Sequence, residues 1–121
     1  MRAARLHPQG GIEALSVDEV EVPRLGPGEA LVQVHAAAIT RDEIDWPTDR
    51  LPAILSYELS GVVEDVAGNV GDIAIGDDVF ALTPFDRDGV AAEHAVVPAA
   101  FLAPKPAGLS HARAPRSLWP G

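Results

Sequence analysis

The sequence contains no cysteine, which excludes disulfides, thiolate metal ligands and a cysteine nucleophile. Basic residues are also scarce: nine Lys and Arg stand against 18 Asp and Glu, giving a formal net charge of −9. Such a charge repels phosphate backbones and anionic lipids, so we expect neither nucleic acid nor a membrane as a partner. Long apolar runs are absent too, because residues 91–104 are interrupted by Glu93, His94 and Pro98. With no export signal at its start, the sequence predicts a cytoplasmic protein.

The 121 residues present fit one domain, and their pattern predicts a mainly β fold. Short β-favouring runs alternate with Gly and Pro turns, as in a barrel or sandwich; they span residues 2–6, 15–22, 30–37, 60–66, 78–82 and 90–97. A change of apolar parity in the second run predicts a β-bulge near Asp18. Helix signals are sparse, and we expect one or two short helical turns, one of them beginning at Thr40.

Six segments, taken in order, resemble the N-terminal catalytic domain of one enzyme family. They are residues 1–7, 26–32 (Gly-Pro-Gly-Glu-Ala-Leu-Val), 35–40, 58–64 (Glu-Leu-Ser-Gly-Val-Val-Glu), 70–80 and 92–98. The chain resembles the GroES-like domain of medium-chain dehydrogenases/reductases, most closely the zinc-less quinone-oxidoreductase-like branch. The resemblance implies a partly open β-barrel over residues 1–112.

In that family the barrel packs beside a Rossmann domain, and the nicotinamide end of NADP or NAD lies between the two. The resemblance therefore implies hydride transfer to a small carbonyl or quinone substrate. The Gly-rich pyrophosphate turn of a Rossmann domain, G-x-G-x-x-G, does not occur in this sequence. We expect the chain to need the missing Rossmann domain as a partner, to be inactive alone, and to form a homo-oligomer through its uncovered cleft face. The alternative is a non-catalytic binding or assembly module that uses the same barrel.

The resemblance assigns three candidate site residues. Thr40 stands where zinc-dependent relatives have a cysteine, and Tyr57 stands where they have a histidine before the glutamate, here Glu58. Neither residue type is a usual zinc ligand, so we expect no metal. Thr40 and Tyr57 are instead the candidate catalytic hydroxyls, which would polarise a substrate oxygen. Thr40 and Trp46 are the candidate cofactor contacts; the alternatives are a helix cap for Thr40 and core packing for the two aromatics.

The last nine residues, 113–121, depart from the family pattern. Relatives continue into an Ala-rich helical segment, whereas this chain has Pro115 and Pro120, which are poorly compatible with a helix. When residues 112–121 are back-translated with one possible set of codons and read in another frame, the resulting amino-acid sequence resembles the family's continuation. The sequence therefore predicts an atypical tail, with a frameshift as one explanation and a naturally short protein as the other.

Overall fold

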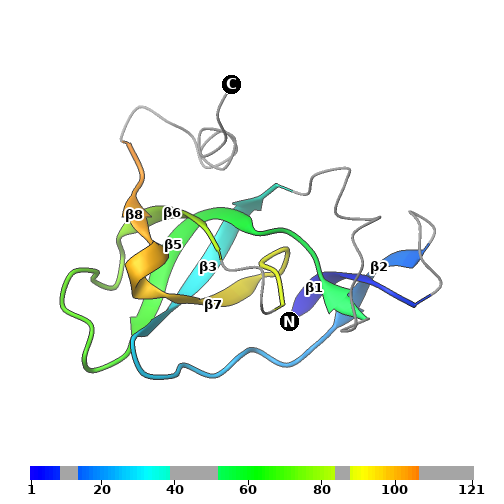
Figure 1. Ribbon diagram of the computed structural model, residues 1–121, viewed down its shortest axis with the longest axis horizontal. Coiled ribbons are helices and arrows are strands. Elements are labelled where there is room, and N and C mark those ends of the chain that lie inside the picture. The colour runs from blue at the N-terminus through cyan, green and yellow to red at the C-terminus, as the bar shows by residue number, and fades with distance from the viewer. Residues whose placement is uncertain (9–13, 39–51, 84–87, 107–121) are drawn as a thin grey trace.

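The computed structural model describes residues 1–8, 14–38, 52–83 and 88–106, and within them the chain forms two antiparallel sheets. The smaller sheet has the order β2-β1-β4, and the larger has the order β7-β3-β5-β6-β8 (Figure 1). The strands are β1 Arg2–Leu6, β2 Leu15–Glu19, β3 Glu29–Ala37, β4 Ala53–Ile54, β5 Glu58–Val66, β6 Asp78–Leu82, β7 His94–Pro98 and β8 Ala103–Pro104. A 3-10 turn, Ala99–Phe101, joins β7 to β8. Among the described residues, no helix is long and apolar enough to cross a membrane.

The main core lies on one face of the five-stranded sheet. Its fully buried valines come from four different strands, and none is more than 1% exposed: Val32, Val63, Val79 and Val97. Val32 of β3 lies opposite Val63 of β5, so the strand pairing itself brings these side chains together. Each aliphatic side chain of this size stabilises the fold by about 1.5–3 kcal/mol when buried. A smaller cluster of Leu6, Ala14 and Leu55 supports the other sheet.

One glycine allows the close approach of β3 and β5. A Cβ added at Gly61 would lie 2.1 Å from the Gln33 carbonyl oxygen and 2.9 Å from Val32 Cγ1. The same strand pair shifts register at two points, between Leu31 and Val32 and again between Val34 and Ala36. These irregularities bend the sheet, as β-bulges do.

The two sheets are joined through β1 and the segment before β7. Ala3 forms an isolated bridge with Ala92, the Glu93 N–H donates to the Arg2 carbonyl at 3.0 Å, and the Ala4 N–H donates to the Ala91 carbonyl at 2.8 Å. The Leu55 N–H then donates to the Ala4 carbonyl at 3.2 Å. The first strand of the chain is thereby held against residues more than 80 positions later.

The mainly β, partly open architecture expected from the sequence is confirmed, because the two sheets do not close into one barrel. The strands expected at 2–6 and 78–82 are found with the same bounds. The bulge expected near Asp18 is wrong: β1 and β2 pair without interruption from Arg2↔Glu19 to Leu6↔Leu15. The parity change instead marks the end of β2 at Glu19. The turn expected at Thr40 lies outside the described residues.

Candidate functional site

Tyr57 lies at a junction of three segments, which are the start of β5, the residue after β6 and the residue after β3. It directly precedes β5, and its carbonyl accepts a hydrogen bond from the Thr83 N–H at 2.7 Å, just beyond the end of β6. The side chain is partly buried. Because the backbone on both sides of Tyr57 is hydrogen-bonded, the phenol is attached to a fixed part of the backbone at the start of β5.

Ser56 supports this junction from below the surface. It is fully buried at 0% exposure, and it adopts a left-handed backbone conformation with φ of 72°. Its hydroxyl donates to the Ala38 carbonyl at 2.6 Å and accepts from the Glu58 N–H at 3.3 Å. Its own carbonyl accepts from the Val90 N–H at 2.8 Å. Sequence reasoning missed Ser56, since nothing in a single serine signals a positive φ.

Glu58 is buried directly beside Tyr57. Only 2% of this residue is exposed, and its carbonyl accepts a hydrogen bond from the Ala38 N–H at 3.2 Å. A carboxylate with this little solvent requires compensation from neighbouring dipoles or charges. Ala38, directly after β3, and Glu58, at the start of β5, are thus connected both through backbone atoms and through the Ser56 hydroxyl.

Unlike the Ser56 hydroxyl, the hydroxyl of Thr83 at the same junction has no hydrogen-bond partner among the described residues. Thr83 is 5% exposed, and its Oγ1 is buried without a bond. An unsatisfied buried hydroxyl costs roughly 1–3 kcal/mol, so native structures contain few of them. The sequence signal was a polar residue at the end of an apolar strand, and it was not recognised.

Two of the three residues expected at the site, Thr40 and Trp46, lie outside the described residues, so only Tyr57 is placed by the structure. A zinc ion does not fit the donors that are placed. Tyrosine stands beside Glu58, and no group of three His, Asp or Glu residues suited to a metal occurs in the described part of the chain.

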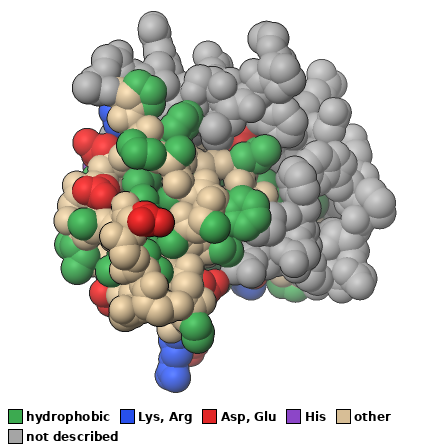
Figure 2. All heavy atoms as spheres, turned by 60° about the vertical axis from the view of Figure 1, so that its left-hand side comes forward, with side chains coloured by type: hydrophobic (Ala, Val, Ile, Leu, Met, Phe, Trp, Pro, Cys, Tyr) green, Lys and Arg blue, Asp and Glu red, His purple; other side chains and the backbone are tan. Residues whose placement is uncertain are grey.

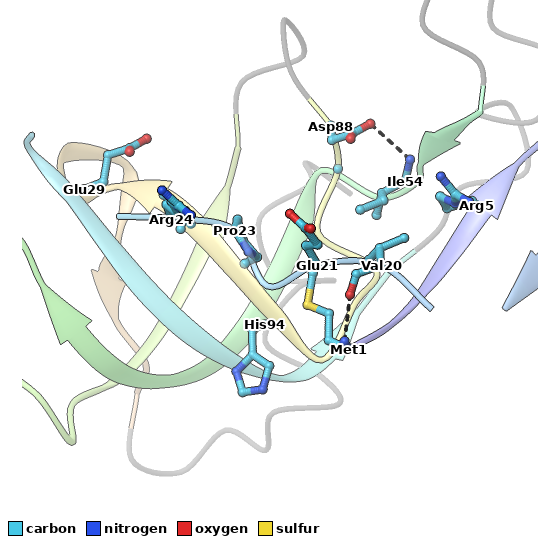
Figure 3. A pocket seen from close by; sticks show the side chains of 13 residues that line it. Met1, Arg5, Val20, Glu21, Pro23, Arg24, Glu29, Ile54, Asp88 and His94 are labelled. Atoms are coloured by element: carbon cyan, nitrogen blue, oxygen red, sulfur yellow. Dashed lines mark hydrogen bonds between the residues drawn. The ribbon is translucent and has the colours of Figure 1, made fainter. Parts of the chain in front are cut away.

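A hollow lies elsewhere, between the crossover after β2 and the edge of β7. This cavity of about 430 Å³ is lined by both acidic and basic side chains, including Arg5, Glu21, Arg24 and Asp88 (Figure 3). The Met1 ammonium donates to the Val20 carbonyl at 2.7 Å along its wall. The His94 ring points away from the other labelled side chains. Neither Tyr57 nor Glu58 lines this cavity, and its mixed charges select no ligand sign.

A polar cluster on β1 and β2 is also separate from the Tyr57 junction. The Asp18 carboxylate accepts from Ser16 Oγ at 2.8 Å and from Arg5 Nε at 2.8 Å, and it lies 2.7 Å from His7 Nε2. The hydrogen bond from Ser16, followed by those from Arg5 and His7, lowers the pKa of Asp18 from 3.8 to about 2. This cluster staples β2 to the end of β1.

Comparison with known proteins places the chain in one family. Residues 26–107 match the alcohol dehydrogenase GroES-like domain. The chain belongs to this family. The relatives that it matches are medium-chain dehydrogenases/reductases, and the chain spans about a third of their length.

Three relatives illustrate the match. The L-threonine 3-dehydrogenase of Pyrococcus furiosus is 32% identical over 124 residues, covering 76% of this chain and 35% of that protein. A solved NAD-dependent alcohol dehydrogenase superposes with a TM-score of 0.84 at 32% identity, covering 92% of this chain and 41% of that one. A Pseudomonas syringae quinone oxidoreductase superposes with a TM-score of 0.83 at 27% identity, covering 93% and 36%. The GroES-like domain of this chain is thus shared by dehydrogenases and quinone oxidoreductases.

Proposed function

We propose that the chain is the catalytic-domain portion of a zinc-independent, NAD(P)H-dependent oxidoreductase that reduces a quinone, enone or carbonyl group. The observation that carries the proposal is Tyr57: within an alcohol dehydrogenase-type domain, a phenol stands beside the buried Glu58 in place of a histidine ligand. The NAD dependence named for the solved alcohol dehydrogenase supports the choice of cofactor class.

The reaction needs a hydride and a proton. A bound reduced nicotinamide would supply the hydride for the electrophilic carbon of the substrate, or for the conjugated position of an enone or quinone. The Tyr57 hydroxyl donates a hydrogen bond to the substrate oxygen and stabilises its developing negative charge. A proton from that hydroxyl or from water completes the reduced product, and water restores the phenol. We propose the same role for Thr40, and cofactor contacts for Thr40 and Trp46.

The chain alone is proposed to be inactive. Hydride transfer requires substrate and cofactor to be held in contact, and in this family the nucleotide is held mainly by a Rossmann domain. We propose that this domain is the required partner, and that the protein works in the cytoplasm. A stand-alone binding module is the competing function, and the partial coverage of the matched relatives is compatible with it.

Titration with NADH and NADPH tests the cofactor part of the proposal. Trp46 and Trp119 provide intrinsic fluorescence, and calorimetry provides an independent readout. We expect no saturable binding by the chain alone. Saturable binding at micromolar cofactor would show that the barrel makes its own nucleotide site and would contradict the proposed need for a Rossmann domain.

The substrate part is tested on Tyr57 itself, which is the single tyrosine of the chain. We expect 2-cyclohexenone or duroquinone to shift the ¹H–¹³C ring resonances of Tyr57. We expect cyclohexane, a ring compound without a carbonyl group, to leave them in place. Equal shifts with all three compounds would reduce the effect to nonspecific apolar contact and would count against a carbonyl-binding role.

A further inference from the structure

Ser56 has a backbone conformation that serine rarely adopts. It is the one non-glycine residue with a positive φ among the described parts of the chain. L-residues in the left-handed region are strained by contact between Cβ and the backbone, and such residues persist only where their surroundings hold them. Strain of this kind concentrates at functional sites, so its position beside Tyr57 calls for an explanation.

The surroundings that hold Ser56 are well defined. Its hydroxyl donates to Ala38 at 2.6 Å, and its carbonyl accepts from Val90 at 2.8 Å. Gly89 packs directly on it, because a Cβ at Gly89 would lie 2.3 Å from the Ser56 carbonyl oxygen. The residue is therefore fixed by two segments that are distant in sequence, the residue after β3 and residues 89–90.

We propose that Ser56 is a positioning residue that sets the orientation of Tyr57 relative to the end of β3. Ala38 directly follows β3 and stands two residues before Thr40, while Tyr57 follows Ser56 directly. The buried hydroxyl thus ties together the two segments that carry the candidate catalytic hydroxyls. The functional value of this orientation rests on the proposed function. The effect of Ser56 on the Tyr57 side chain can be measured without it.

Two substitutions separate the backbone strain from the hydroxyl bond. Ser56→Gly removes the hydroxyl and also relieves the left-handed strain, so the two effects oppose each other and the Tm stays within about 5 °C of the unchanged chain. Ser56→Ala removes the hydroxyl and keeps the strain, so the Tm falls by roughly 5–10 °C. Ser60→Ala is the matched control, because Ser60 is also 0% exposed and lies on β5.

The readout is the set of ¹H–¹³C ring resonances of Tyr57, recorded without cofactor or substrate. We expect one set in the unchanged chain and in Ser60→Ala, and shifted, broadened or doubled resonances in Ser56→Gly and Ser56→Ala. Superimposable Tyr57 resonances in a folded Ser56→Gly chain would overturn the proposal.

A measurement on the unchanged chain keeps the proposal testable if both variants fail to fold. The Ser56 hydroxyl proton should exchange slowly enough to be observed, because it is buried and bonded to Ala38. A hydroxyl proton lost at the rate of an exposed serine would contradict the tie. Since no ligand is present, these results do not depend on whether the chain binds NAD(P)H or a carbonyl compound.

Discussion

At the scale of single residues, the clearest electrostatic feature is Asp18. Three side chains from β1 and β2 converge on its carboxylate, and they hold its pKa at about 2 against an ordinary value of 3.8. A group whose folded pKa is lowered stabilises the fold above its unfolded pKa and loses that contribution as the pH falls through the folded pKa. The stabilisation by Asp18 is therefore complete above about pH 4 and disappears towards pH 2.

Replacement of Asp18 by Asn should reproduce this pH window. We expect the free energy of unfolding of Asp18→Asn to lie below that of the unchanged chain at pH 6 and to approach it as the pH falls from 4 to 2. Urea unfolding followed by circular dichroism at each pH gives the difference. Glu19→Gln, on the same strand but largely exposed, is the control and should show a smaller difference. A difference for Asp18→Asn that stays constant down to pH 2 would contradict the lowered pKa.

A glycine pair tests the close approach of β3 and β5. Gly61→Ala places a methyl group against backbone atoms of Gln33, which cannot move independently, so we expect a destabilisation of about 1–3 kcal/mol or more. Gly68→Ala has nothing within 4 Å of the added Cβ and should change the stability by about 0.5 kcal/mol or less. Urea unfolding measures both variants, and equal effects would mean that the strands separate at little cost.

At the scale of elements, periodicity and turn residues predicted the longer strands well. The runs at 2–6 and 78–82 are bounded by turn-forming residues, and their bounds match β1 and β6. The two-residue strands Ala53–Ile54 and Ala103–Pro104 were not predicted, because alternation cannot be read over so short a length. The expected strand at 90–97 begins only at His94, since residues 91–93 bond to β1 instead.

The candidate site was predictable only where side-chain chemistry marks it. Tyr57 could be selected because the resemblance puts it where zinc-dependent relatives have a histidine before the glutamate, and its role stays a prediction. Ser56 and Thr83 could not, because a positive φ and a buried unsatisfied hydroxyl depend on contacts between distant segments. The assignments of Thr40 and Trp46, and the division at residue 112, stay predictions.

The contact between the two sheets can be tested with proline. The Ala4 N–H donates to the Ala91 carbonyl, so Ala4→Pro removes a bond that joins the sheets, and we expect a loss of roughly 3 kcal/mol or more. Val17 lies opposite Ala4 on the edge strand β2, between two hydrogen-bonded pairs, so its N–H faces away from β1.

Val17→Pro is therefore the matched control, and it should cost much less than Ala4→Pro because edge strands tolerate proline. Thermal unfolding followed by circular dichroism measures both. If Val17→Pro were as damaging as Ala4→Pro, the link between the sheets would not be the stabilising element inferred here.

At the scale of the whole molecule, charge and exposed apolar surface act against each other. The formal net charge is −9, while Ile75 and Phe101 remain 65% and 49% exposed. Figure 2 shows acidic side chains beside hydrophobic ones on the face that the left-hand side of Figure 1 presents. Mutual repulsion of the acidic groups keeps copies apart, and it also destabilises the folded state.

Salt should therefore raise the stability of this chain. Increasing NaCl from about 0.01 M to 0.15 M shortens the Debye length from about 30 Å to about 8 Å and screens the repulsion, so we expect the Tm at pH 7 to rise by a few degrees. Scanning fluorimetry measures the change. The same series near the isoelectric point of 4.6 is the control and should give a much smaller rise. A Tm that falls with salt at pH 7 would mean that attractive ion pairs outweigh the net charge.

The link between β1 and residues 91–93 also affects synthesis. A ribosome releases Arg2–Leu6 first, and β2 becomes available soon after, but the bonds from Ala4 to Ala91 and from Glu93 to Arg2 cannot form until that late segment emerges. Most of the chain must therefore be translated before its first strand gains these bonds to residues 91–93. During that interval the β1–β2 hairpin exposes unpaired backbone groups along β1. Chaperones or proteases would recognise the nascent chain at this exposed strand.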